Sequence, residues 1–193
     1  MQLNLPTWLT LFRLVLVPLL VLLLMMPFFP GQNILSTAIF GLALATDWLD
    51  GWLARRWGQT SGFGAFLDPV ADKLIVCAVL VLLVYRDPHI VVALPATLII
   101  GREIAVSALR EWMAEIGQRG LVAVGAAGKY KTSIQMIAIL VMLYALPTQG
   151  RLYGFGVTLL AIAAVLTVWS MVMYLRAAWP LLRGGGPGGG GPP

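Results

Sequence analysis

The chain contains few charged residues for its length. Only 11% of its 193 residues are Asp, Glu, Lys or Arg, whereas roughly a quarter are charged in an ordinary soluble domain. Hydrophobic residues make up 60% of the chain, and the mean hydropathy is +0.89. This composition excludes both a soluble globular protein and an intrinsically disordered one.

Cysteine and histidine are scarcer still. The chain has one of each, Cys77 and His89. A single cysteine cannot form a disulfide within the chain, and one Cys with one His does not supply the ligands of an ordinary zinc site. We expect Cys77, which lies in an apolar run, to be a buried structural thiol.

The sequence does contain long apolar runs. About twenty apolar residues cross a bilayer as a helix, and six such runs cover residues 8–29, 34–53, 69–85, 90–112, 132–146 and 152–175. They leave no room for a separate soluble domain. We therefore predict an all-α integral membrane protein, with six transmembrane helices forming one domain over residues 1–180. The remaining segment 184–193, GGGPGGGGPP, has no side chain able to pack, and we expect it to be a disordered tail.

The basic residues indicate the orientation. If the chain crosses six times, eleven of its 13 Lys and Arg residues fall at or toward the side of the N-terminus, and only Arg86 and Arg151 fall on the other side. Cytoplasmic loops carry such an excess of positive charge. We predict that both termini are cytoplasmic, and we assign the net charge of +5 to these loops rather than to nucleic-acid binding.

Four of the eight acidic residues lie within 26 positions at the inner ends of the second and third runs. A carboxylate at membrane depth costs about 3 kcal/mol or more, which favours a functional role. Asp47 and Asp50 share one helix face. Asp68 precedes Pro69, so we expect it to cap the third helix, with Asp72 one turn further in. A short loop joins the second and third runs, so we predict that they form antiparallel neighbouring helices. Their inner ends can then bring the four acids together.

Four carboxylates in one small site repel one another, and hard divalent cations relieve that repulsion. Oxygen ligands indicate Mg²⁺, Mn²⁺ or Ca²⁺, and four carboxylates balance the charge of two such ions. Gly51 and Ala54 keep the same helix face small, so that a metal-bound diphosphate can approach the backbone, and Arg55 can hold a phosphate oxygen. The alternative is a set of helix caps and surface salt bridges.

These positions form one motif, Asp47-x₂-Asp50-Gly51-x₂-Ala54-Arg55-x₈-Gly64-x₃-Asp68-x₃-Asp72. The motif resembles the signature of the CDP-alcohol phosphatidyltransferase family at every position. Other segments are similar to family members that use a glycerol phosphate acceptor: 4–13, 46–51, 63–73, 102–111 and 128–132. Thr7 departs from the pattern, because many relatives carry Asn there.

The resemblance implies a reaction and a set of site residues. CDP-diacylglycerol would be the donor and sn-glycerol 3-phosphate the acceptor, with phosphatidylglycerophosphate and CMP as products. Two Mg²⁺ or Mn²⁺ ions would be held by the four aspartates, and Asp72 would also be the general base. Gly51, Ala54, Arg55 and Gly64 would shape the CDP site. The protein would be a homodimer in the inner membrane, among its lipids, with its active site facing the cytoplasm.

A phosphorylated acceptor needs cations. Arg102 and Arg110 are eight residues apart, about 80° around a helix axis, and Lys129 and Lys131 precede the fifth run. We expect these four residues to form the acceptor-phosphate pocket. The alternative is that they contact lipid headgroups.

Three other functions fit parts of the pattern. A sister enzyme would use inositol phosphate, phosphatidylglycerol or serine as acceptor. An intramembrane prenyltransferase also binds a diphosphate through acids and Mg²⁺, but it has more helices and another Asp spacing. A divalent-cation transporter would place its acids near the bilayer midplane in repeated halves, and no internal repeat is visible here.

Overall fold

The computed structural model describes residues 5–57, 62–116, 126–145 and 150–182, and these residues form six α-helices. They are α1 (Leu5–Met25), α2 (Gln32–Trp57), α3 (Gly62–Arg86), α4 (Ile90–Glu115), α5 (Ala126–Ala145) and α6 (Gly150–Leu182). The predicted all-α class is confirmed. The tail 184–193 lies outside the described residues.

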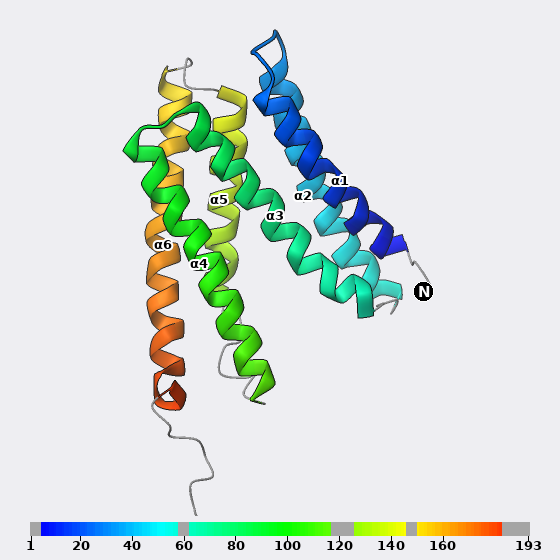
Figure 1. The fold of residues 1–193 in the computed structure, drawn as a ribbon, viewed down its shortest axis with the longest axis vertical. Coiled ribbons are helices and arrows are strands. Elements are labelled where there is room, and N and C mark those ends of the chain that lie inside the picture. The colour runs from blue at the N-terminus through cyan, green and yellow to red at the C-terminus, as the bar shows by residue number, and fades with distance from the viewer. Residues whose placement is uncertain (1–4, 58–61, 117–125, 146–149, 183–193) are drawn as a thin grey trace, which may run out of the picture.

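The helices alternate in direction and fall into two groups (Figure 1). In the first group α1 packs against both α2 and α3, and in the second α6 packs against α4 and α5. Contacts of α2 with α5, and of α3 with α4, join the two groups. The beginning of α1 and the end of α6 lie toward the same, lower end of the molecule in Figure 1.

Helix α1 lies between α2 and α3. This arrangement corrects the expectation that α2 and α3 pack directly against each other. In the described part of the chain α2 and α3 do not pack along their lengths. The reason is the buried stripe of α1, where Leu16, Leu20 and Leu24 join the common hydrophobic core. The same stripe is polar at its beginning, where Thr7 and Arg13 are buried. A polar site can therefore form near the beginning of α1, where this helix packs against α2 and α3.

The start of α3 corrects a second expectation. The helix begins at Gly62, so Asp68 does not cap it and Pro69 lies inside it. A proline within a helix removes one backbone hydrogen bond, and its predecessor is disfavoured in the α conformation. Arg13 of α1 contacts both Asp68 and Asp72, which are one turn apart on α3. The continuous helix thus places both carboxylates on the side that contacts α1.

The turn between α1 and α2 and the far ends of the first three helices are fixed by hydrogen bonds. Gly31 has a φ of 90°, in the left-handed region that favours glycine, and its carbonyl accepts a hydrogen bond from the N–H of Leu35 at 2.9 Å. Arg86, at the end of α3, donates to the carbonyl of Leu24 at 2.8 Å and to Oε1 of Gln32 at 2.9 Å. These bonds hold the ends of α1, α2 and α3 together opposite the acids.

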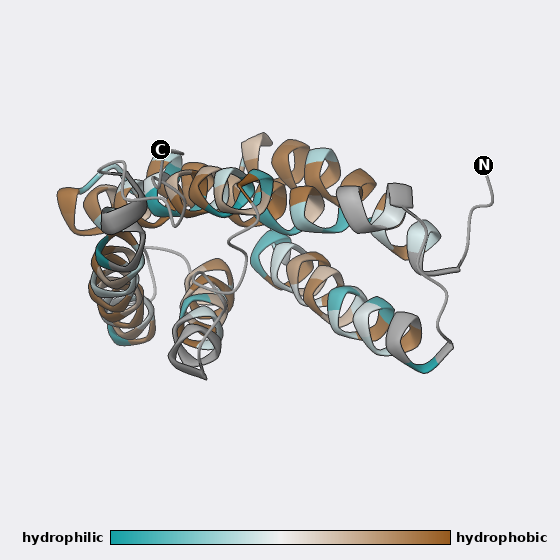
Figure 2. Ribbon diagram, turned by 90° about the horizontal axis from the view of Figure 1, so that it is seen from below, coloured by the Kyte–Doolittle hydropathy of each residue, from teal (hydrophilic) through white to brown (hydrophobic). Residues whose placement is uncertain are grey.

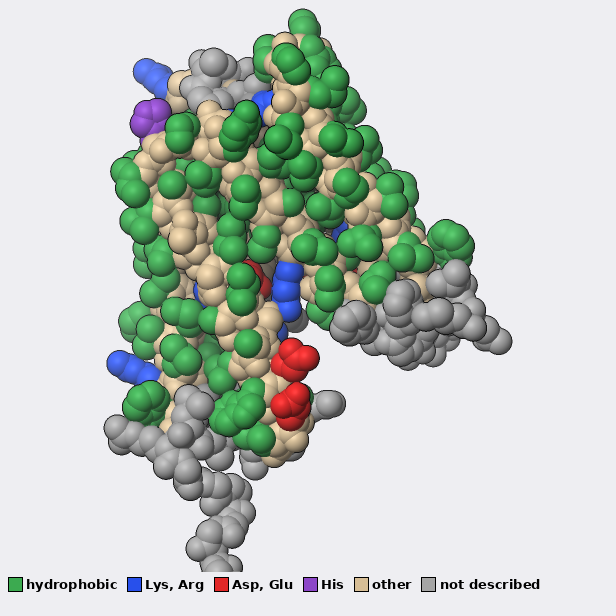
Figure 3. Space-filling view, in the orientation of Figure 1, with side chains coloured by type: hydrophobic (Ala, Val, Ile, Leu, Met, Phe, Trp, Pro, Cys, Tyr) green, Lys and Arg blue, Asp and Glu red, His purple; other side chains and the backbone are tan. Residues whose placement is uncertain are grey.

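The outer surface is apolar. Hydrophobic residues, drawn in brown, recur along the helices in Figure 2, and hydrophobic side chains dominate the face seen in Figure 3. Large side chains such as Leu22, Trp48 and Trp169 are each at least 65% exposed. In the described residues, three helical stretches are long and apolar enough to cross a membrane: Thr7–Met25, Ile90–Glu115 and Gly150–Arg176. Such a surface fits lipid rather than water.

Candidate functional site

The four aspartates converge on one guanidinium group. Nη1 of Arg13 lies 2.9 Å from Oδ1 of Asp47 and 3.4 Å from Oδ1 of Asp68, and it also contacts Oδ1 of Asp72. Nη2 of the same arginine contacts Oδ2 of Asp50. Two acids come from α2 and two from α3, so Arg13 on α1 is the centre of a cluster built by three helices.

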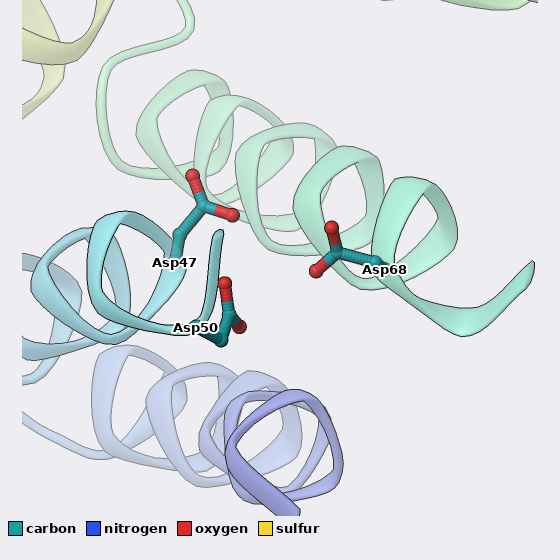
Figure 4. A group of neighbouring side chains, drawn as sticks. All are labelled: Asp47, Asp50 and Asp68. Carbon is teal, nitrogen blue, oxygen red and sulfur yellow. The ribbon is translucent and has the colours of Figure 1, made fainter. Parts of the chain in front are cut away.

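The acids differ in their access to solvent. The side chain of Asp50 is 4% exposed, whereas those of Asp47, Asp68 and Asp72 are 41–43% exposed. Figure 4 shows Asp47 and Asp50 on α2 and Asp68 on α3, with their carboxylates directed into a shared space. Asp50 therefore lies behind the other three, which remain accessible to a ligand.

The donor set fits a hard divalent cation. Carboxylate oxygens of Asp47, Asp50 and Asp68 lie within 4.8 Å of one another. Two oxygens on opposite sides of one Mg²⁺ ion are about 4.2 Å apart, since each lies about 2.1 Å from the metal. These oxygens are therefore near the spacing that one ion requires once the Arg13 guanidinium that contacts them has moved, and the exposed carboxylate of Asp72 is beside them.

The three accessible acids line a cavity of about 720 Å³. Lys73 and Glu103 also line it, with Arg110 on α4 and Gln135 on α5. A volume of this size is typical of small-molecule sites. The cavity thus combines the aspartates of α2 and α3 with the cations Lys73 and Arg110, the carboxylate of Glu103 and the amide of Gln135, a set of groups suited to a ligand that has both phosphate and hydroxyl groups.

A second charged cluster adjoins this cavity through Glu103. Nη1 of Arg102 pairs with Oε1 of Glu103 at 2.6 Å, and the Arg102 side chain is 6% exposed. The guanidinium carbons of Arg102 and Arg110 lie 6.0 and 5.6 Å from the ring centroid of Tyr174 on α6. Cations at this distance from an aromatic face are attracted to it. Only Arg110 of the two arginines belongs to the cavity lining.

Some residues expected in the site lie partly outside the described part of the chain. The side chains of Ala54, Arg55, Lys129 and Lys131 are not described, although their backbones belong to α2 and α5. Gly51 follows Asp50 on α2, and Gly64 precedes Asp68 by one turn on α3. Both glycines are half-buried.

Sequence reasoning missed Arg13, Lys73 and Gln135 as site residues. The signal for Arg13 was present, because a charged residue in an apolar run is costly and needs a partner. The position of Lys73 directly after Asp72 also indicated that this lysine lies near the site. The sequence around Gln135 gave no such indication, since nothing local shows that this face of α5 points into the cavity rather than into lipid.

The comparisons with known proteins agree on one family. The CDP-alcohol phosphatidyltransferase family model matches residues 3–169. Relatives from Sodalis glossinidius (strain morsitans) and Yersinia pestis (strain Pestoides F) are 53% and 54% identical, over 92% and 93% of this chain and 96% and 97% of their own. A relative from Pectobacterium atrosepticum is 53% identical over 92% of this chain and 96% of its own. All three are named CDP-diacylglycerol–glycerol-3-phosphate 3-phosphatidyltransferase.

Proposed function

The chain belongs to the CDP-alcohol phosphatidyltransferase family, and on this premise we propose that it transfers the phosphatidyl group of CDP-diacylglycerol to sn-glycerol 3-phosphate. The products are phosphatidylglycerophosphate and CMP. The observation that carries the proposal is the convergence of Asp47, Asp50, Asp68 and Asp72 beside a cavity that three of them line together with Arg110. The names of relatives that are more than half identical over nearly the whole chain support the two substrates.

The four aspartates would hold two divalent cations, Mg²⁺ or Mn²⁺. When bound, such ions neutralise charge on a diphosphate and on the leaving phosphate. The hard oxygen ligands and the spacing of Asp47, Asp50 and Asp68 support this role. Gly51, Ala54, Arg55 and Gly64 form the CDP site in this proposal, because they neighbour the acids on α2 and α3.

Asp72 is the general base in the proposed reaction. Its side chain is 42% exposed and lines the cavity, so it can accept the proton of the acceptor's C1 hydroxyl. That oxygen then forms a bond to the phosphorus carrying diacylglycerol, while the bond from this phosphorus to the CMP oxygen breaks and CMP leaves with the electron pair. The proton remains on Asp72. Holding both substrates in one cavity supplies a further part of the acceleration.

Arg110, Arg102, Lys129 and Lys131 form the acceptor-phosphate pocket in this proposal. Arg110 supports it directly, since its side chain lines the same cavity as Asp72. Arg102 is buried beside Glu103, and both arginines lie near the ring of Tyr174, which can fix their orientation. A guanidinium can bind phosphate through two parallel hydrogen bonds, which fits an acceptor that already carries phosphate.

We also propose the membrane arrangement. All six helices cross the inner membrane, both termini are cytoplasmic, and the cavity opens to the cytoplasm, where the water-soluble acceptor is found. The excess of basic residues toward one side and the apolar outer surface support this orientation. A homodimer in the membrane is part of the same proposal.

The test supplies the purified protein in detergent with CDP-diacylglycerol, Mg²⁺ and labelled acceptors. We expect label from sn-glycerol 3-phosphate to enter lipid as CMP is released, and we expect EDTA to stop both processes. Incorporation only from inositol phosphate, phosphatidylglycerol or serine would instead identify a sister enzyme. Uptake of Mn²⁺ into proteoliposomes with no release of CMP would identify a transporter and overturn the proposal.

A further inference from the structure

Arg13 is the most completely buried charge in the described part of the chain, with 1% of the residue exposed. Its guanidinium contacts all four aspartates, and a single nitrogen, Nη1, contacts three of them across two helices. An arginine side chain does not lose its proton in a protein. A permanent positive charge is therefore fixed at the point where the carboxylates converge.

A divalent cation would bind the same carboxylates. Mg²⁺ binds oxygen at about 2.1 Å, and Nη1 of Arg13 already lies 2.9 Å from Oδ1 of Asp47. Since Nη1 alone contacts three of the acids, a metal ion placed among the same carboxylates would have to displace that nitrogen. The guanidinium and a metal ion therefore cannot share Asp47, Asp68 and Asp72 in this arrangement.

The arginine is also incompletely paired where it lies. Its Nε is buried and has no hydrogen-bond partner among the residues described. A buried donor without a partner is unfavourable. In this position the Arg13 side chain therefore leaves its Nε–H donor unused. If the guanidinium shifted away from the acids, a new hydrogen bond from Nε could offset part of the lost contacts.

We propose that Arg13 competes with divalent cations for the four aspartates. Its guanidinium keeps the carboxylates together and withdraws from Asp47, Asp68 and Asp72 when a cation binds. This inference rests on the proposed metal-binding role of the aspartates. It makes Arg13 a positioning residue that weakens metal affinity while it stabilises the cluster.

These two effects have opposite signs, which separates the proposal from a purely structural role. If Arg13 only supported the fold, its loss would weaken metal binding together with stability. If it competes with the metal, its loss strengthens metal binding and lowers stability when metal is withheld.

The test measures Mn²⁺ binding by electron paramagnetic resonance on the purified full chain in detergent. We expect Arg13→Met, which keeps an unbranched apolar stem without the charged guanidinium, to bind Mn²⁺ at least about tenfold more tightly than the wild type, a change of about 1.4 kcal/mol. The matched control is Arg151→Met, which removes the same charge from an exposed position outside the cluster. It should bind Mn²⁺ as the wild type does.

Thermal unfolding provides a second measurement. In EDTA the Arg13→Met protein should unfold at a lower temperature than the wild type. Adding Mn²⁺ should raise the unfolding temperature of the variant by more than it raises that of the wild type. If that variant does not fold, Arg13→Lys serves instead, because an ammonium lacks the planar fork that contacts all four acids. It should bind Mn²⁺ more tightly than the wild type.

Unchanged or weaker Mn²⁺ binding in these variants, with normal binding by the wild type, would overturn this inference and leave the proposed function intact. Absence of Mn²⁺ binding in every protein would overturn the proposed metal site, and this inference with it.

Discussion

Tyr153 on α6 donates a hydrogen bond from its hydroxyl to Oδ2 of Asp87, 2.8 Å away, and so ties α6 to the turn between α3 and α4. The other carboxylate oxygen contacts Nδ1 of His89. Burial by itself would raise the pKa of Asp87, but the hydrogen bonds from His89 and Tyr153 outweigh it, so the pKa lies below its usual value. Asp87, His89 and Tyr153 form a cluster at the end of α3 and the beginnings of α4 and α6. Asp68 and Asp72, which are proposed to bind metal, lie in the first half of α3.

Tyr153→Phe should lower the free energy of unfolding by about 1.5–3 kcal/mol, the usual range for a hydrogen bond to a charged group. Thermal or chemical unfolding in detergent measures the change. The control is Tyr144→Phe, because the Tyr144 hydroxyl has no hydrogen bond to any described residue. Equal losses in the two variants would show that the bond to Asp87 contributes nothing specific.

The lowered pKa of Asp87 gives a pH dependence. A carboxylate whose pKa is lowered by folding stabilises the protein at pH values above its unfolded pKa, here the ordinary 3.8. That contribution is lost as the pH falls through the lowered folded value. We therefore expect the midpoint difference between wild type and Asp87→Asn to be constant near neutral pH and to shrink below pH 3.8. A difference that grows in acid would contradict the hydrogen-bonded cluster.

Gly156 lies where α6 packs tightly against α5. A Cβ atom there would lie 2.7 Å from Cγ of Met142 and 3.3 Å from the Met142 backbone nitrogen. Gly156→Ala should therefore destabilise the protein by about 1–3 kcal/mol, the usual result of overpacking. Gly154→Ala is the matched control on the same helix, since a Cβ atom there meets nothing within 4 Å.

The control should be neutral, or stabilising by up to about 1 kcal/mol, because alanine favours helix over glycine. Unfolding midpoints in one detergent compare the two variants directly. Equal midpoints would mean that α5 and α6 move apart freely at this contact.

Asp72→Asn should abolish most of the proposed transfer while the protein stays folded. Asparagine keeps the shape of the side chain but cannot accept the proton, and loss of a general base lowers kcat by about 10²–10⁴-fold. CMP release gives the rate, and thermal unfolding checks the fold. Glu115→Gln, at an exposed acid on α4, should retain full activity. Near wild-type turnover by Asp72→Asn would remove the role assigned to Asp72.

Arg110→Ala should raise the KM for sn-glycerol 3-phosphate by about 10- to 100-fold, the effect of losing a charge-assisted hydrogen bond of about 1.5–3 kcal/mol. The KM for CDP-diacylglycerol should change far less, because Arg110 lies on α4, whereas the residues proposed to form the CDP site lie on α2 and α3. Initial rates with each substrate varied in turn measure both constants. Arg110→Lys should recover part of the affinity. Equal changes in the two constants would contradict a specific contact with the acceptor.

Local patterns were enough to predict the helices. The apolar runs anticipated α4 well, since its predicted start at residue 90 is the observed one. They failed at α3, where Pro69 appeared to mark the start of a helix that in fact begins at Gly62. The local preference of Asp68-Pro69 does not reveal that Asp68 and Asp72, one turn apart on the observed helix, both contact Arg13 on α1.

By itself the sequence determined the all-helical class, the family and the four acids, because composition, hydrophobic periodicity and motif spacing are properties of neighbouring residues. Only the tertiary structure decided that α1 lies between α2 and α3, that Arg13 is the centre of the acids, and that Arg110 and Gln135 share their cavity. In an apolar chain many helix faces are equally hydrophobic. The face that turns inward is therefore fixed by long-range packing and by the pairing of the few buried charges.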